Sequence, residues 1–371
     1  MTRVVRSFST PVNIALNAAI VAVTDASPRI LCMPGGPETG HSDGLPFGAF
    51  DPASHRTFES GLRQSVESLT ALTLGYVEQL YTFGDRGRHR VDGGEGGHPV
   101  SVGYLALTRI DKQAAEAISG TGARWRGWYD FFPWEDWRQG RPELLDTLIL
   151  PRLSAWALEA QTLEMTTRQQ SRIRLAFGID DFPWDEERVL DRYELLYEAG
   201  LLEESVADGR YATTGLVRPL GGQMQYDHRR IAATAIARLR AKIKYRPVIF
   251  ELMPPEFTLT ELQTTVEAIA GRHLHKQNFR RLVEGAELVE ATGESSSRTG
   301  GRPAALYRFR SQILEERPAP GLRFGGGEFG ATARLHATPH QITHGADVRI
   351  HEGLILKRHL VPTHSRASIA H

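Results

Sequence analysis

The pattern of apolar and polar positions is clearest over residues 257–309, where it predicts two helices followed by a hairpin. The first helix has one apolar face, formed at helical spacing by Leu259, Leu262, Val266 and Ile269. Thr258 and Glu261 have the spacing of a capping box, in which each side chain bonds the other residue's backbone amide. Gly271 stands where a helix ends in a left-handed residue. This helix therefore has predicted ends as well as a predicted buried face.

The second helix is predicted over residues 275–284, with Gly285 ending it. Its apolar residues Phe279, Leu282 and Val283 are expected to face the first helix. The outward positions contain no acid and are Lys276, Gln277, Asn278, Arg280 and Arg281. Arginine and lysine suit guanine edges and phosphates, and asparagine and glutamine suit adenine. This mix is typical of a helix that reads the major groove.

Residues 288–290 and 306–309 are predicted to form a hairpin joined by a polar, glycine-rich loop. The loop residues Arg298, Thr299 and Arg302 suit a wing that contacts phosphate or the minor groove. Together these elements predict a winged helix-turn-helix that binds double-stranded DNA. The alternative is a helical hairpin with a solvated basic face, but the capped helix, glycine turn, acid-free helix and arginine wing favour DNA binding.

The first 110 residues predict strands around one helix. Residues 13–23 and 29–33 form a predicted hairpin, 57–70 a helix, and 75–83 and 100–110 two further strands. The glycine-rich segment 85–97 is interpreted as an exposed linker, with phosphate binding as the weaker alternative. Cys32 is expected to be a buried strand residue and not a nucleophile.

The middle of the chain predicts helices. An aromatic run over 125–137 precedes a helix at 144–163, with a kink expected at Pro151, and another helix at 188–202. Its tryptophans suit core or dimer contacts better than stacking on adenine. Residues 180–208 are rich in acid, whereas 228–246 contain seven arginine and lysine residues and no acid.

Composition changes this picture little. The 371 residues carry 44 Lys and Arg against 44 Asp and Glu, so net charge does not argue for nucleic acid. One cysteine excludes an intrachain disulfide and favours a reducing, cytoplasmic location. No stretch is long and apolar enough to span a membrane, and the apolar run near the N-terminus is interpreted as a first strand and not as a signal peptide.

Several segments resemble the NrtR group, Nudix-related repressors of NAD metabolism. They are Leu45-Pro46-x-Gly48, 63–68, 78–85, 100–107, 226–228, 238–245, 257–259, 276–281 and 301–304. The resemblance implies an α+β fold: an N-terminal Nudix-like α/β sandwich followed by a C-terminal winged helix-turn-helix. It covers both ends of the region up to residue 310 but not the middle. The expanded middle resembles the NadQ-type regulators of NAD biosynthesis, which carry a helical insertion.

The resemblance predicts five segments: a Nudix-like domain (1–124), a helical insertion (125–225), a basic linking helix (226–246), the winged helix-turn-helix (247–310) and a glycine- and histidine-rich tail (311–371). In the tail, His336, His340 and His344 are four residues apart, but Pro339 argues against a helical zinc site. A polar tail is the better interpretation.

The Nudix-like motif departs from a catalytic one. A catalytic box places several glutamates on one helix face to hold Mg²⁺. Here Arg63 and Glu67 remain, but Gln64 and Ser68 replace acids and His55 stands at the upstream glutamate position. We therefore expect no catalytic residues, no bound metal and no required cofactor. The rival hypothesis is a Nudix-type nucleotide pyrophosphohydrolase with an accessory winged helix, and a third is an adaptor that binds neither nucleotide nor DNA.

The favoured hypothesis is a transcriptional repressor controlled by an adenine nucleotide such as ADP-ribose, NAD or ATP. Gln79, Tyr81 and Phe83 alternate along one face of a predicted strand, and Tyr104 lies on a later strand that could neighbour it. The rings suit stacking on a base, and Arg63 and Gln79 suit polar or phosphate groups, although any half-buried strand alternates in this way. A homodimer on a palindromic operator is also expected, with the sheet and the basic helix 227–244 supplying its contacts.

Overall fold

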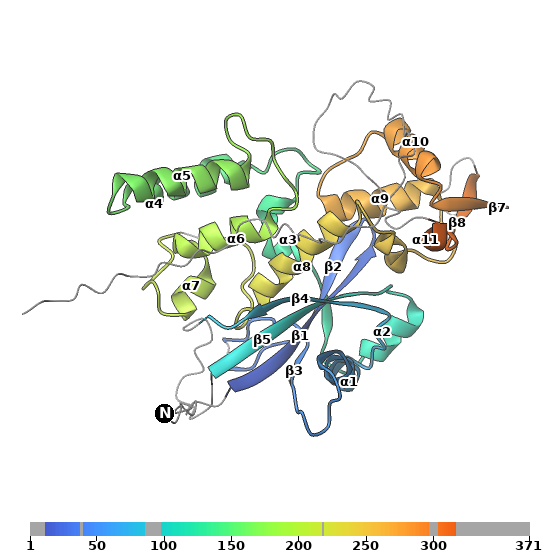
Figure 1. Ribbon diagram of the computed structural model, residues 1–371, viewed down its shortest axis with the longest axis horizontal. Helices are drawn as coiled ribbons and strands as arrows, with labels where there is room; N and C mark the ends of the chain where they lie inside the picture. Colours follow the sequence, from blue (N-terminus) through green and yellow to red (C-terminus); the bar gives the residue numbers. More distant parts are fainter. Residues whose placement is uncertain (1–11, 38–39, 86–97, 217–218, 297–302, 317–371) are drawn as a thin grey trace, which may run out of the picture. The chain divides into compact units, whose positions relative to one another are not determined.

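The computed structural model describes residues 12–37, 40–85, 98–216, 219–296 and 303–316 (Figure 1). All of them belong to one compact unit. The sandwich, insertion and winged helix are found in the predicted order, so the α+β fold class is confirmed. None of the helices in the described ranges is long and apolar enough to cross a membrane.

The N-terminal sheet is mixed and has the strand order β4-β5-β1-β2-β6, with β3 also paired to β1. The strands are β1 (Val12–Thr24), β2 (Ser27–Cys32), β3 (Phe47–Ala49), β4 (Tyr76–Phe83), β5 (His98–Leu107) and β6 (Arg124–Gly127). β1 and β5 run parallel, and the other pairs are antiparallel. Asp25 and Ala26 take positive φ values of 49° and 57° in the predicted β1–β2 turn. Cys32 is buried as expected, and burial raises the pKa of its thiol to about 12.

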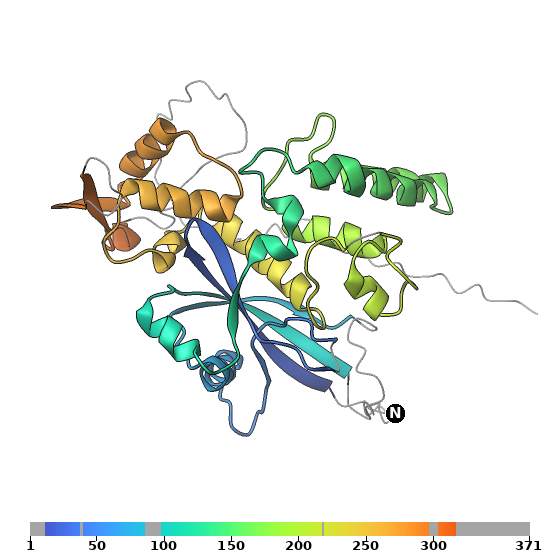
Figure 2. The same cartoon turned by 180° about the vertical axis from the view of Figure 1, so that it is seen from behind.

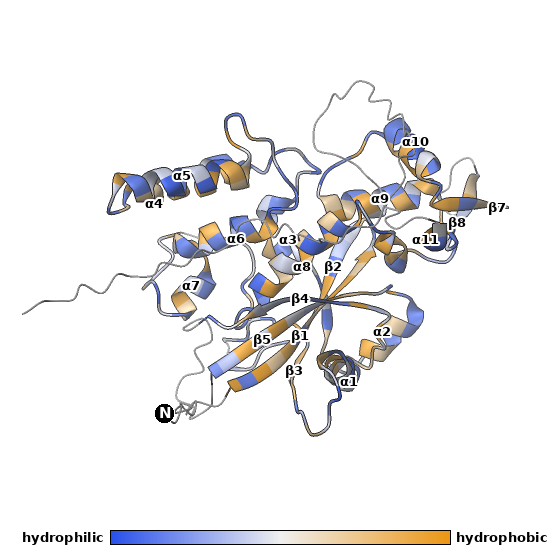
Figure 3. Cartoon of the chain, in the orientation of Figure 1, coloured by the Kyte–Doolittle hydropathy of each residue, from blue (hydrophilic) through white to orange (hydrophobic). Residues whose placement is uncertain are grey.

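Helices cover both faces of this sheet. Helices α1 (Phe58–Thr70) and α2 (Lys112–Ile118) pack on one face, and α8 (His228–Lys242) and the insertion lie on the other (Figure 2). Thr57 caps α1, and this helix matches the predicted one. Figure 3 shows the central strands as mainly apolar, as expected for strands buried on two sides.

The insertion is an array of short helices. They are α3 (Trp128–Phe131), η2 (Pro133–Glu135), η3 (Leu145–Ile149), α4 (Leu150–Leu158), α5 (Leu163–Phe177), α6 (Val189–Glu198) and α7 (Glu203–Ala207). Trp128 and Trp134 are fully buried, so their interpretation as core residues is confirmed.

The helix predicted over 144–163 is wrong at its end. It stops at Leu158, and the Thr162 hydroxyl accepts a bond from the Met165 amide (3.2 Å) to begin α5. The break expected at Pro151 falls earlier, because η3 is a π-helical stretch that ends at Ile149. Helix 188–202 is shorter than predicted, since α6 ends at Glu198 and Gly200 turns the chain with φ of 72°.

The described C-terminal elements are η4 (Val248–Leu252), α9 (Leu259–Ala270), α10 (Lys276–Ala286), β7 (Val289–Ser296), β8 (Ala304–Phe309) and α11 (Ile313–Glu316). β7 and β8 form the predicted antiparallel hairpin. The three histidines considered for zinc, the glycine-rich linker beyond Asp85 and the predicted tail from residue 317 lie outside the described residues.

Candidate DNA-binding and ligand-binding surfaces

Helix α9 is built as its sequence predicts. The Thr258 hydroxyl accepts the Glu261 amide at 3.1 Å, and the Glu261 carboxylate accepts the Thr258 amide at 2.6 Å. Gly271 ends the helix with φ of 73°. The four residues of the predicted apolar face are all buried. Reciprocal capping fixes where α9 begins, and the left-handed Gly271 begins the turn that leads into α10.

Helix α10 packs against α9 through Phe279 and Val283, which are both buried. Gly285 does not end it as predicted. The helix continues to Ala286 and ends at Glu287, which takes the left-handed conformation (φ of 52°). Glycine weakens a helix interior but does not forbid it, and the chain must turn one residue before Leu288 packs in the core.

Helix α10 contains both hydrophilic and hydrophobic residues (Figure 3). All five predicted DNA-contacting residues of this helix are exposed: Lys276, Gln277, Asn278, Arg280 and Arg281. Arg281 donates to the neutral Asn278 side chain at 2.7 Å. Within the described residues Lys276, Arg280 and Arg281 form no ion pair. Their charges are therefore available to a polyanion. Arg298, Thr299 and Arg302 of the wing lie outside the described residues.

The predicted ligand residues do not share one face of the sheet. Gln79 pairs with Tyr104, whose hydroxyl donates to Gln79 Oε1 at 3.2 Å. A bulge then shifts the register between Gln79 and Thr82. One extra residue reverses which face the following side chains occupy. Tyr104 accordingly packs in the cluster beneath α1, whereas Phe83 packs in the cluster beneath α8. The single aromatic face expected for Gln79, Tyr81, Phe83 and Tyr104 is wrong.

Two of the rings differ further in exposure. Tyr81 is 57% exposed, whereas Phe83 is buried with the Arg230 guanidinium 4.8 Å from its ring centroid. The rings of Tyr81 and Phe83 meet edge to face at 5.2 Å. Phe83 therefore serves the core, and of these two rings Tyr81 is the one that a ligand could reach from solvent.

Arg63 is held by the protein itself. Its guanidinium pairs with Glu59 (2.9 Å) and donates to the carbonyls of Leu74 and Gly75. It therefore braces α1 against the start of β4, and with Gln79 and Tyr104 it lies on the α1 side of the sheet. In the same region His55 accepts the Asp51 amide at 3.1 Å. Across the described ranges no group of three acidic, histidine or cysteine side chains is placed to hold a metal ion.

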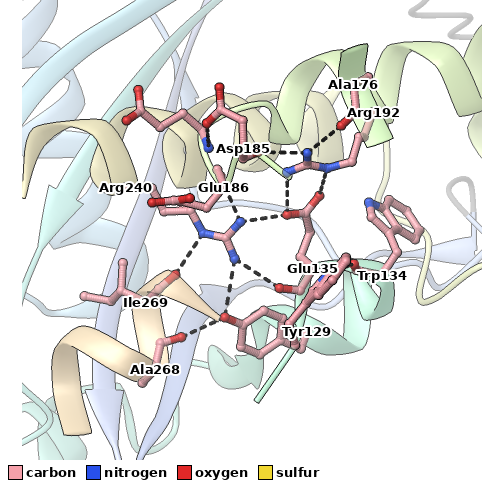
Figure 4. A network of polar contacts seen from close by, with 12 residues as sticks. Tyr129, Trp134, Glu135, Ala176, Asp185, Glu186, Arg192, Arg240, Ala268 and Ile269 are labelled. Carbon is pink, nitrogen blue, oxygen red and sulfur yellow. Dashed lines mark hydrogen bonds and ion pairs between the residues drawn. The ribbon is translucent and has the colours of Figure 1, made fainter. Parts of the chain in front are cut away.

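A buried ionic network joins the insertion, α8 and the winged helix, and sequence reasoning missed it (Figure 4). Glu135 pairs with Arg192 of α6 at 2.5 Å and with Arg240 of α8 at 2.7 Å, and all three side chains are at most 1% exposed. Arg240 also donates to the Ile269 carbonyl at the end of α9 (2.8 Å). Arg240 belongs to the basic segment 228–246, but Glu135 lies outside the acid-rich segment 180–208, so the charge pattern of the sequence did not point to this pair.

Backbone contacts complete this junction. The Trp137 amide donates to the Gly271 carbonyl at 2.6 Å. A side-chain carbon at Gly271 would lie 2.4 Å from the Glu135 carbonyl oxygen. Gly271 is thus required by its positive φ and by the close approach of the insertion. The insertion and α8 hold the end of α9 from two sides.

Comparison with known proteins identifies relatives of the C-terminal elements. The model of the NrtR DNA-binding winged helix domain matches residues 249–309. The ADPR responsive transcriptional repressor NtrR of Acinetobacter baylyi is 45% identical over 89 residues, which are 24% of this chain. The match spans about a third (35%) of that relative's length.

Solved structures give a broader but weaker likeness. Shewanella oneidensis NrtR complexed with a 27mer DNA is 20% identical, with 81% of this chain and 95% of that one covered at a TM-score of 0.49. The Nudix domain of the same protein, complexed with ADP ribose, is 22% identical, with 32% and 73% covered at a TM-score of 0.25. The resemblance predicted for the C-terminal region is confirmed: residues 249–309 of this chain fold as a winged helix and match the NrtR DNA-binding winged helix domain.

Proposed function

We propose that this protein is a DNA-binding transcriptional repressor of NAD-metabolism genes, controlled by an adenine nucleotide. The observation that carries the proposal is the exposed cationic side of α10 within a winged helix. Arginines presented in this way reach base edges and phosphates in the major groove. The name of the Acinetobacter relative, an ADPR responsive repressor, supports ADP-ribose as the first effector to test, with NAD and ATP beside it.

A gel-shift titration with the DNA upstream of the protein's own gene tests the proposal. We expect specific binding that Arg280→Ala and Arg281→Ala each weaken and that ADP-ribose, NAD or ATP alters. Arg152→Ala on the exposed side of α4 is the matched control, because it removes the same charge far along the chain from α10. Equal binding by all three variants, with folding intact, would contradict the assignment of α10.

We also propose a homodimer on a palindromic operator, because one short helix and one wing cover few base pairs. Arg229 and Arg240 of α8 are buried and paired inside the protomer, so these two side chains are not available for dimer contacts, whereas Arg238 of the same helix is 49% exposed. Analytical ultracentrifugation of the chain with and without operator measures the state. A single copy that binds tightly would contradict the dimer.

We further propose that the sandwich does not hydrolyse nucleotides. Glu59 is engaged by Arg63, and Glu67 is the remaining exposed carboxylate of the motif on α1. Purified protein with Mg²⁺ and ADP-ribose tests this. Sustained turnover that Glu67→Gln abolishes would support the pyrophosphohydrolase instead.

A further inference from the structure

The C-terminal end of α9 is bonded by groups that lie outside the winged helix (Figure 4). The Tyr129 hydroxyl of α3 donates to the Ala268 carbonyl at 2.7 Å. The Ile269 carbonyl accepts from α8, and the Gly271 carbonyl accepts the Trp137 amide of the insertion. The last carbonyls of a helix have no partner within that helix. Here the insertion and α8 supply the partners, so the end of α9 is fixed to them.

An ion pair holds the next residue of the chain. Arg272 Nη2 lies 3.4 Å from Glu186 Oε1, which belongs to the loop before α6, and the Glu186 side chain is 3% exposed. The same carboxylate pairs with Lys244 at 3.0 Å. Burial alone would raise the pKa of Glu186, but Arg272 and Lys244 lower it below its ordinary value. The insertion therefore holds the chain on both sides of Gly271.

The turn between the two helices carries this restraint to α10. The Glu267 carboxylate accepts the Leu274 amide at 2.9 Å, and the Gln263 side chain donates to the Leu274 carbonyl at 2.8 Å. Helix α10 begins two residues after Leu274, and Phe279 and Val283 are buried where it packs on α9. Because α9, the turn and α10 are joined in this way, the contacts that fix the end of α9 also fix where the exposed side of α10 lies.

We propose that the insertion positions α10 for DNA binding, with Tyr129 and Glu186 as positioning residues. The proposal rests on the proposed function, because a dimer on a palindromic operator needs its two α10 helices at a fixed separation. An arrangement that is fixed before binding does not have to be ordered in the complex. A looser junction would leave each α10 intact but make it harder for both to meet their half-sites together.

Fluorescence anisotropy on the full chain tests the proposal, with the operator selected by gel shift and with one half of its palindrome. Tyr129→Phe removes the hydroxyl and keeps the ring, and Glu186→Gln removes the charge and keeps the shape. We expect each to weaken binding to the full operator about threefold to tenfold, the range for one hydrogen bond. Half-site affinity should stay within about twofold, since one α10 is enough to bind it.

The sign of the Glu186→Gln effect separates positioning from simple electrostatics. Loss of a negative charge beside Arg272 would by itself strengthen binding to a polyanion. Loss of positioning weakens binding to the full operator instead. Tighter or unchanged binding by Glu186→Gln would therefore contradict its role as a positioning residue.

Two control variants remove the same groups from pairs that lie within the insertion. The Tyr197 hydroxyl bonds Asp208 at 2.6 Å, and Glu198 pairs with Arg172 at 2.6 Å. Tyr197→Phe and Glu198→Gln should lower stability but leave the ratio of full-operator to half-site affinity at its wild-type value. Urea unfolding measures the stability of all four variants, and circular dichroism verifies that each is folded.

The outcomes separate the positioning role from the proposed function. A wild-type ratio in both Tyr129→Phe and Glu186→Gln would overturn positioning by the insertion and leave the repressor function standing. Equal losses on the full operator and the half-site would also overturn it, because they would show damage to α10 itself. A wild-type chain that binds both DNAs equally would exclude the dimer and positioning together. A wild-type chain that shifts no DNA would overturn the proposed function as well.

Discussion

Helices α8 and α10 are both rich in arginine and lysine, and neither 228–246 nor 276–281 contains an acid. In α8 the arginines form ion pairs with carboxylates of the same chain. Arg229 pairs with Glu204 at 3.2 Å, Arg240 with Glu135 at 2.7 Å, and Arg238 with Glu78 at 3.2 Å. In α10 the cations are exposed and form no ion pair with described residues.

The difference lies in what the rest of the chain supplies. The acid-rich segment 180–208 folds against the basic segment 228–246. Glu194 and Glu204 pair with arginines of α8, and Glu186 and Glu187 pair with Lys244, which follows this helix. The acid-rich segment provides no such partner to the arginines of α10. A basic run thus predicts DNA contact only where the fold leaves its charge uncompensated.

The largest expected effect is on stability, from Arg240→Ala in α8. This change leaves Glu135 buried with one cation in place of two, and it removes the bond to the Ile269 carbonyl. Breaking a buried ion pair costs about 3–5 kcal/mol. Urea unfolding followed by circular dichroism measures it, with exposed Arg152→Ala as the control. A loss below about 1 kcal/mol would mean that the network adds little.

The second test is the pH dependence of stability, which should report the ion pair between Glu135 and Arg240 of α8. Burial alone would raise the pKa of Glu135, but Arg192 and Arg240 lower it below its ordinary value. A carboxyl with a lowered folded pKa stabilises the protein above the unfolded pKa of about 4.3 and loses this contribution as pH falls through the folded value. The stability gap between wild type and Glu135→Gln should therefore shrink below about pH 4. A gap that stays constant from neutral pH to about pH 3 would contradict this.

The third test moves to α10. Arg280→Ala and Arg281→Ala should each weaken operator binding by about 1–3 kcal/mol, because a base or phosphate contact is lost. Stability should change by no more than about 0.5 kcal/mol, since both side chains are exposed. Fluorescence anisotropy and urea unfolding on the same samples measure the two effects. If either substitution lowers stability more than it weakens DNA binding, the arginines of α10 would have a structural role like those of α8.

The smallest effect is on salt dependence. Lys276 lies in the first turn of α10 and is exposed, a place suited to phosphate. Lys276→Ala should weaken binding to specific and unrelated DNA alike and reduce the slope of log affinity against log salt by about one. Anisotropy titrations at several salt concentrations measure the slope. An unchanged slope, with weaker binding to the operator alone, would indicate a base contact instead.

The sequence by itself determined the elements whose signals are local. The Thr258–Glu261 capping box and the turn at Gly271 act over a few residues, so their chemistry is legible without the fold. The same holds for the β1–β2 turn and for the apolar face of α9. These features were sufficient to predict the winged helix and to select the residues exposed on α10.

Only the tertiary structure decided the rest, because it depends on partners far away in the chain. Arg240 meets Glu135 across 105 positions, and no spacing rule identifies such a pair. The bulge in β4 is set by pairing with β5, and it moved Phe83 to the opposite face from Tyr104. Whether a charge or a ring serves the core or a ligand is decided by what packs against it.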